Sequence, residues 1–167
     1  MKATHQQIAT KKGFTLLEVM IAMVIFAVGM LGLAGIQALS LENSHSSYSR
    51  SQAVLLAYEM VDRIKANSGV AGNYVTAHGN AAAEPASANK CDQFTCGFAA
   101  MAAFDLWQWK TALANNLLSG DGSVVNTTGT TYTITVHWDE DRTGATGTTC
   151  PPAVATDLRC FQLTTTF

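Results

Sequence analysis

The chain has 167 residues, a formal net charge of −2 and a hydrophobic fraction of 48%. About 100 of the residues lie outside a long N-terminal helical stretch, which supports one modest globular domain, and a second domain is not expected. The ten Lys and Arg residues are scattered along the chain, so nucleic-acid capture through a basic patch is not expected.

An apolar segment, residues 14–35, comes first in chain order, and Glu18 is its single charge. As a helix it spans about 33 Å at 1.5 Å per residue, enough to cross a hydrocarbon core of about 30 Å. Three lysines and no acid precede it. The positive-inside rule therefore predicts one membrane pass, with a cytoplasmic N-terminus and a periplasmic C-terminal part. The alternative is a cleaved secretory signal, whose apolar core would be shorter and free of acids.

The position of Glu18 inside this segment is energetically costly. An ionised side chain near the middle of a bilayer costs roughly 2.5–3.5 kcal/mol on insertion scales. We therefore expect the carboxylate to have a partner and a function. In the alternative interpretation the side chain only snorkels to the lipid headgroups near the start of the helix.

The run Lys11-Lys12-Gly13-Phe14-Thr15-Leu16-Leu17-Glu18 resembles the class III signal of type IV pilins and pseudopilins. The resemblance implies that a membrane prepilin peptidase cuts between Gly13 and Phe14 and methylates the new amine of Phe14. It also implies that Glu18 pairs with the N-terminal amine of a neighbouring subunit during assembly, since two charges that are each unfavourable in lipid offset each other as a pair. Loss of residues 1–13 would leave 7 Lys and Arg against 12 Asp and Glu, a net side-chain charge of −5.

Residues 28–37, 48–53 and 57–67 resemble the PilV-type minor pilins, also called type IV pilus modification proteins. The resemblance implies a minor pilin that helps to initiate pilus assembly, is incorporated at or near the tip and supports twitching motility. Its implied partners are the prepilin peptidase, other minor pilins, the major pilin, the inner-membrane assembly platform and membrane lipid. No nucleic acid, metal or cofactor is expected. The implied location is the inner membrane and later the extracellular pilus.

Two other functions share parts of this pattern. A type II secretion pseudopilin would carry the same signal and the same acid, and a tip adhesin would present residues 70–90 or 150–160 to a surface. An enzyme is the least favoured class, because the chain lacks a nucleophile elbow, a phosphate loop and an HExxH motif. The implied cleavage and methylation at the signal are catalysed by the peptidase, for which this chain is a substrate.

The expected domain organisation is a leader at 1–13, a membrane-spanning helix half at 14–35, an amphipathic helix half at 36–68 and a periplasmic globular domain at 69–167. One helix is predicted over 14–67, because no proline precedes Pro85 and apolar residues of its second half recur at helical spacing: Val54, Ala57, Tyr58, Val61 and Ile64. Three glycines, Gly29, Gly32 and Gly35, predict a weak point that either melts in the filament or allows close helix packing.

The globular part is predicted to begin with an irregular connection over residues 70–90. A second helix follows over 98–118, with Leu106, Trp109, Leu113 and Leu117 on one face. Period-2 alternation predicts strands at 132–138 and 159–167, and Val124-Val125 adds a short third strand. The fold class is therefore α+β and pilin-like: a long N-terminal helix packed against a small antiparallel sheet.

The four cysteines lie on the side expected to be oxidising, where disulfides persist. Of three possible pairings we favour the two local ones, Cys91 with Cys96 and Cys150 with Cys160, over a structural zinc site, since no C-x-x-C spacing occurs. Residues 137–141 gather candidate metal ligands and imitate the start of an EF-hand loop from Asp139. Cys150 stands where that loop needs a bidentate glutamate, so a solvated turn is favoured over calcium.

Overall fold

The computed structural model describes residues 13–79, 82–85 and 91–167. The expected leader, apart from Gly13, and part of the expected connection over 70–90 lie outside the described residues. The chain divides into two compact units, Met1–Asn43 and Ser44–Phe167, which are described separately below.

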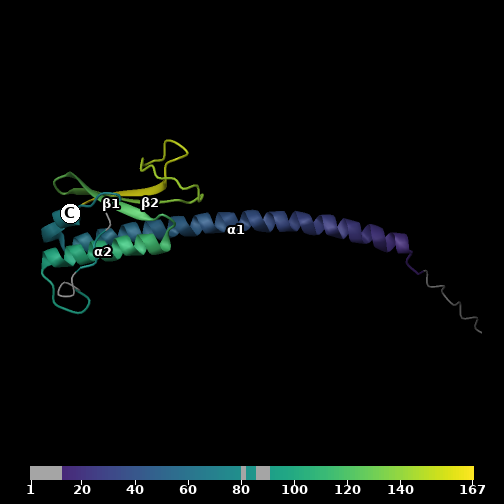
Figure 1. Cartoon of the computed structure of the whole chain (residues 1–167), viewed down its shortest axis with the longest axis horizontal. Coiled ribbons are helices and arrows are strands. Elements are labelled where there is room, and N and C mark those ends of the chain that lie inside the picture. Colours follow the sequence, from purple (N-terminus) through teal and green to yellow (C-terminus); the bar gives the residue numbers. More distant parts are fainter. Residues whose placement is uncertain (1–12, 80–81, 86–90) are drawn as a thin grey trace, which may run out of the picture. The chain divides into compact units, whose positions relative to one another are not determined.

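One helix, α1, runs without interruption from Leu16–Ala66 and crosses the boundary between the units (Figure 1). The predicted helix over 14–67 is confirmed to within two residues at each end. The helix is intact across the three glycines, and whether that segment melts inside a filament stays a prediction. A 3₁₀ helix, η1, follows at Ser68–Tyr74. The prediction of irregular structure directly after residue 69 is therefore wrong, because the chain winds tightly to bury Tyr74.

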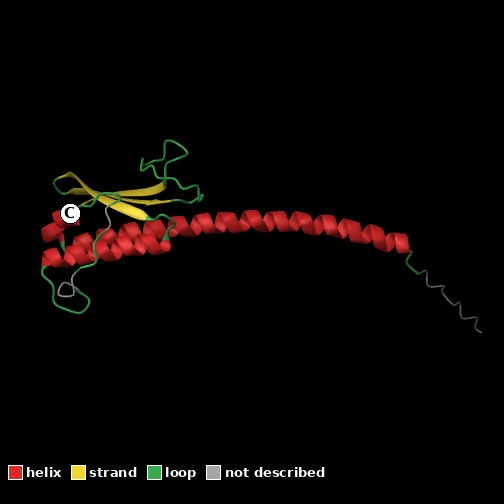
Figure 2. Ribbon diagram, in the orientation of Figure 1, coloured by secondary structure: helices red, strands yellow, loops and turns green. Residues whose placement is uncertain are grey.

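The globular unit contains a three-stranded antiparallel sheet of order β1-β2-β3 (Figure 2). The strands are β1 at Asp121–Thr128, β2 at Thr131–Trp138 and β3 at Arg159–Thr166. Val124 lies opposite Ile134, which lies opposite Leu163, so these three side chains share one face of the sheet. The strands predicted over 132–138 and 159–167 are confirmed as β2 and β3. The short strand predicted at Val124-Val125 is β1, which is longer than expected.

The core lies between the sheet and two helices. Helix α2, Phe98–Asn116, lies beside the C-terminal part of α1, and the sheet covers both (Figures 1 and 2). The Nε1–H of the fully buried Trp109 donates to the main-chain oxygen of Leu56 at 2.9 Å and joins the two helices. The core comprises residues of α1, η1, α2 and the sheet: Ala53, Leu56, Ala57, Met60, Val61, Ile64, Ala71, Tyr74, Ala102, Trp109, Leu113, Leu117, Val124, Tyr132, Ile134, Val136 and Trp138.

Two positions where the chain leaves α2 and enters β1 admit only glycine, because the main chain there packs closely against α2. A Cβ atom at Gly120 would collide with the main chain of Leu113, and one at Gly122 would collide with the ring of Trp109. The predicted helix end near these glycines is confirmed, since α2 stops at Asn116. Close approach, rather than turn conformation, explains their use at these two positions.

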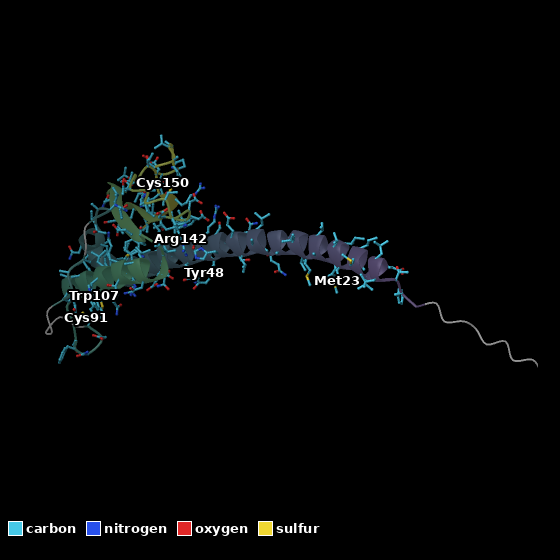
Figure 3. The ribbon with its side chains drawn as sticks, turned by 45° about the vertical axis from the view of Figure 1, so that its right-hand side comes forward. Met23, Tyr48, Cys91, Trp107, Arg142 and Cys150 are labelled. Carbon is cyan, nitrogen blue, oxygen red and sulfur yellow. A yellow bond between two sulfur atoms is a disulfide. The ribbon has the colours of Figure 1, made fainter. Side chains whose placement is uncertain are left out.

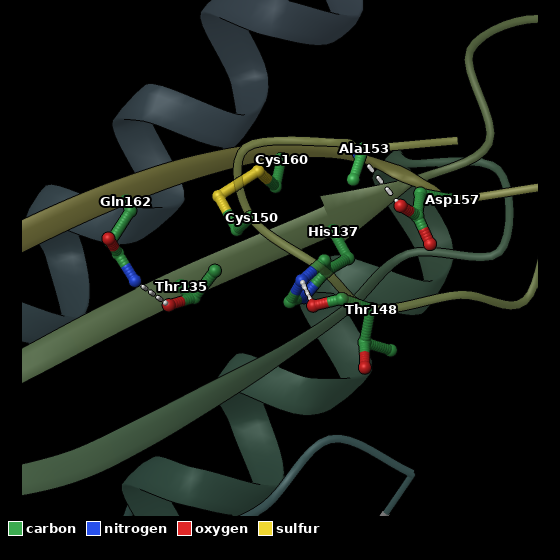
Figure 4. The surroundings of a disulfide bond; sticks show 8 residues. All are labelled: Thr135, His137, Thr148, Cys150, Ala153, Asp157, Cys160 and Gln162. Carbon is green, nitrogen blue, oxygen red and sulfur yellow. Dashed lines mark hydrogen bonds between the residues drawn. A yellow bond between two sulfur atoms is a disulfide. The ribbon is translucent and has the colours of Figure 1, made fainter. Parts of the chain in front are cut away.

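Two expectations about burial need correction. Tyr58 was placed on the inner face of α1 but is 51% exposed, while Leu56 and Met60 are buried, because α2 covers the side of α1 that carries Leu56. Strand β2 was expected to be half-buried, yet Thr135 and His137 on its second face are also buried. The chain after β2 covers this face, and His137 Nε2 lies 3.1 Å from the main-chain oxygen of Thr148 (Figure 4).

A partly buried polar network joins α1, η1 and α2. Arg63 donates to Glu59 at 2.6 Å and to Asp105 at 2.6 Å. The Tyr74 hydroxyl donates to the other oxygen of Asp105 at 2.6 Å and accepts from Asn67 at 3.2 Å. Every member has a partner, which is the condition under which a buried polar network specifies one arrangement of its elements.

The cysteines form the two local disulfides favoured from the sequence. Cys91 is bonded to Cys96 with a Cα–Cα distance of 5.4 Å, and Cys150 to Cys160 with 5.9 Å. The second bond attaches the loop after β2 to the start of β3 (Figure 4). Both bonds lie in the globular unit.

Candidate membrane and assembly site

The N-terminal half of α1 is exposed along its whole length. Residues 13–45 are all exposed, including large apolar side chains such as Phe14 at 83% and Leu31 at 74%. By length and composition α1 can cross a membrane, with a mean hydropathy of 2.6 in its most apolar window and none of that window buried. The side chains around Met23 project outward along this stretch (Figure 3). Such a surface requires lipid or other apolar helices around it.

Thr15 determines where the helix starts. Its Oγ1 accepts a hydrogen bond from the backbone N–H of Glu18 at 3.3 Å, and its main-chain oxygen accepts from Glu18 and Val19 at 3.1 and 3.3 Å. This is an N-cap, with Glu18 at the third helical position, where an acid also interacts favourably with the helix dipole. Gly13 and Phe14 consequently lie outside the helix.

Glu18 is the acidic residue of the first turn of α1. Its carboxylate has no hydrogen bond or ion pair with any residue in the described part of the chain. The side chain borders a shallow apolar groove along α1, which is lined by Phe14, Glu18, Val19, Ala22, Met23 and Phe26. A negative group at the rim of an apolar groove can accept a cation that enters from a neighbouring molecule.

The structure brings three of the predicted signal residues together at the start of α1. Gly13, Phe14 and Glu18 lie within six residues, with Phe14 and Glu18 on the same groove. Thr15 is a functional residue that the signal motif does not itself identify as the capping residue. The Thr15-x-x-Glu18 spacing, which is that of a capping box, was the available signal.

The candidate metal ligands at residues 137–141 do not converge on one site, because the side chains have separate hydrogen-bond and ion-pair partners. Asp139 accepts backbone hydrogen bonds from Thr143 at 3.1 Å and Gly144 at 2.8 Å. Burial alone would raise the pKa of Asp139, but these hydrogen bonds hold it below its usual value. Glu140 accepts from Ser46 and pairs with Arg159 at 3.4 Å. Within residues 13–79, 82–85 and 91–167, no three His, Cys, Asp or Glu residues form a preformed metal-binding group.

Comparison with known proteins gives two adjoining matches. Residues 8–34 match the family model "Prokaryotic N-terminal methylation motif", and residues 35–107 match the model "Tt1218-like: Type IV pilin Tt1218". Searches of curated proteins and of solved structures found no match. The first match covers the signal and the exposed half of α1, and the second continues through the buried half of α1 into α2. Together with the long helix packed on a small antiparallel sheet, the two matches support the assignment of this chain to the type IV pilin superfamily.

Proposed function

We propose that this chain is a PilV-type minor pilin that helps to prime type IV pilus assembly and is incorporated at or near the pilus tip. The observation that carries the proposal is the exposed apolar half of α1 with one unpartnered acid in its first turn. The methylation-motif match over residues 8–34 supports processing by a prepilin peptidase.

Assembly follows from the chemistry at the start of α1. Cleavage between Gly13 and Phe14 leaves a free ammonium group at Phe14, which the peptidase then methylates. In lipid, neither this ammonium nor a Glu18 carboxylate is solvated, and each gains when the ammonium of one subunit meets the carboxylate of another. The groove beside Glu18 is apolar, so the Phe14 side chain of the arriving subunit can enter it with its amine.

We assign each segment of the chain a position relative to the inner membrane. Residues 1–13 are the cytoplasmic leader, 14–35 span the inner membrane, 36–68 continue as the amphipathic helix half and 69–167 form the periplasmic domain. Disulfides persist in that compartment, and both disulfides of this chain lie in the globular unit. After extraction from the membrane, the apolar half of α1 would pack among the helices of other pilins.

The decisive experiment replaces Glu18 in the native strain. The E18A variant should enter the membrane and be cleaved normally, yet its amount in sheared pili should fall at least tenfold relative to wild type. E42A is the matched control, since Glu42 is also an exposed acid of α1 and should not alter incorporation. Wild-type incorporation of E18A, or a mature N-terminus other than methylated Phe14 by mass spectrometry, would contradict the proposal.

A deletion strain tests the cellular role. Loss of the protein should lower surface piliation and twitching motility while leaving secreted exoproteins unchanged. A loss of exoprotein secretion with normal piliation would instead indicate a type II secretion pseudopilin. Loss of attachment with a normal number of pili would indicate a tip adhesin.

A further inference from the structure

His137 is an unusual residue for the second face of β2, because it is buried with one ring nitrogen unused. It is 3% exposed. Its Nε2 lies 3.1 Å from the main-chain oxygen of Thr148 (Figure 4). A carbonyl oxygen can only accept, so Nε2 carries the proton and Nδ1 carries a lone pair. Nδ1 is buried, and none of the described residues hydrogen bonds with it.

A second histidine, which also has a buried ring nitrogen, lies beside His137. His78 follows η1 in the chain, and its ring meets that of His137 edge to face with the centroids 5.0 Å apart. His78 Nε2 is also buried without a hydrogen-bond partner among the described residues. The carboxylate of Asp121 is the nearest charge, at 3.7 Å from Nε2, which is too long for a hydrogen bond.

Asp121 is held in place by other groups. Lys110 Nζ lies 2.5 Å from its Oδ1, and the backbone N–H of Gly79 donates to its Oδ2 at 2.6 Å. Burial would raise the pKa of Asp121, but the hydrogen bond from Lys110 and those from Gly79 and Gly122 lower it, so the carboxylate is charged. Lys110 offsets that charge, and the two imidazoles remain the unsatisfied groups of the cluster.

Two buried ring nitrogens without partners need an explanation, since nearly all buried polar atoms in native proteins have one. We propose that His78 and His137 bind one divalent cation of the zinc class, through His78 Nε2 and His137 Nδ1. Imidazole nitrogens are preferred ligands of zinc, copper and nickel. The site comprises two protein ligands and leaves the other positions to water.

The geometry and chemistry of the pair suit this role. Two zinc–nitrogen bonds of about 2.0–2.1 Å need nitrogens roughly 3.3 Å apart in a tetrahedral site, and rings with centroids 5.0 Å apart can present them at that separation. Metal-binding histidines commonly donate their second ring N–H to a main-chain oxygen, as His137 does to Thr148.

The bound cation would connect segments that are far apart in the sequence. His78 lies in the connection after η1, while His137 lies near the end of β2, next to the loop that Cys150 attaches to β3. A metal that binds the folded chain and not the unfolded one raises its stability by mass action. The site is therefore expected to stabilise the globular unit without any part in the Glu18 pairing.

The test uses the full chain in detergent micelles with its disulfides intact and without reductant. The background variant H5Q/H45Q removes the only two other histidines and serves as the matched control. Titration with Zn²⁺ should show one site in both wild type and H5Q/H45Q, with a higher melting temperature. H78Q should weaken the affinity at least tenfold. Co²⁺ should give the absorption bands of a low-symmetry nitrogen site in H5Q/H45Q and not in H78Q.

The outcome is decided by H78Q, whose side chain is partly exposed at 28%, because H137Q removes a buried group and can impair folding. If Zn²⁺ does not bind to wild type or raise its melting temperature, an ordered water accounts for the two nitrogens and the proposal is overturned. Equal binding by wild type and H78Q overturns it as well.

Discussion

The two halves of α1 belong to one continuous helix, yet they have opposite surroundings. Before residue 44 every described residue of the helix is exposed, whereas Ala53, Met60 and Ile64 in the second half are completely buried. Residues 16–36 are apolar on all sides apart from Glu18, while the second half carries an apolar stripe and a polar face. Helix formation is therefore independent of which medium covers the helix. The distribution of apolar residues around the axis decides whether lipid or protein covers it.

The two halves of α1 are also stabilised by different interactions. The second half is stabilised by packing, by the Arg63 network and by hydrogen bonds to α2. The first half has its helical backbone and the cap at Thr15, and its large apolar side chains are exposed. Substitutions in the second half should therefore alter the unfolding of the globular unit, and those in the first half should alter only membrane behaviour and assembly.

Matched isoleucines on α1 should show the largest contrast. Ile64 is fully buried and Ile25 is 67% exposed. I64A should lower the free energy of unfolding of the globular unit by about 2–5 kcal/mol, because it creates a cavity. I25A should change it by less than about 0.5 kcal/mol. Urea unfolding in micelles, followed by near-ultraviolet circular dichroism, measures both, and equal losses would refute the division of the helix.

Removal of either disulfide should give the next largest loss of unfolding free energy. Loop-closure entropy predicts a loss of about 2.8 kcal/mol for C150S/C160S and about 2.2 kcal/mol for C91S/C96S, because sequence separations of 10 and 5 close loops of 11 and 6 residues. Urea unfolding of each double variant against wild type gives both values. A larger loss for C91S/C96S would show that loop length does not determine the ranking.

Removing the Tyr74 hydroxyl should cost about 1–3 kcal/mol, because Asp105 and Asn67 each lose a partner. Burial, and next the hydrogen bond to Asp105, raise the pKa of Tyr74 above its usual value. A raised pKa in the folded state means that this contribution is present below about pH 10 and is lost as the pH rises further. The alkaline fall in unfolding free energy should therefore be smaller in Y74F than in wild type.

The smallest effect is expected at the start of the first half. T15A removes the cap and should destabilise the first turn of α1 by about 1 kcal/mol, whereas T15S keeps a capping hydroxyl. Amide hydrogen exchange at Leu16–Glu18 in micelles measures the difference, with the globular unit unaffected. Equal exchange in T15A and T15S would show that lipid, rather than Thr15, determines where the helix begins.

Much of the fold could be predicted because its signals are local. The helix over 16–66, α2 and the strands β2 and β3 follow from periodicities of 3.6 and 2 within short windows. The face of α1 that is buried could be predicted only in part. Tyr58 fitted the expected helical spacing and Leu56 was not part of it, yet Leu56 is buried and Tyr58 is exposed, because α2 packs on the side of α1 that carries Leu56.

The residues of the candidate site at the start of α1 could be named from the sequence, since Gly13, Phe14 and Glu18 are near neighbours in the chain, while their roles in cleavage, methylation and docking stay predictions. The histidine pair could not. His78 and His137 are separated by nearly sixty residues, and no local pattern distinguishes a pair that meets in the folded chain from two solvated side chains. The same holds for Arg63 and Asp105, which are 42 residues apart.

The amino-acid sequence by itself determined the apolar helix, its single acid, the signal before it and the α+β class, because these depend on neighbours in the chain and on transfer from water. Only the tertiary structure decided which polar groups are buried together: the Arg63 network, the Lys110–Asp121 pair and the two histidines. The physical reason is that burial depends on what the rest of the chain places over a side chain, and that is a property of contacts between distant segments.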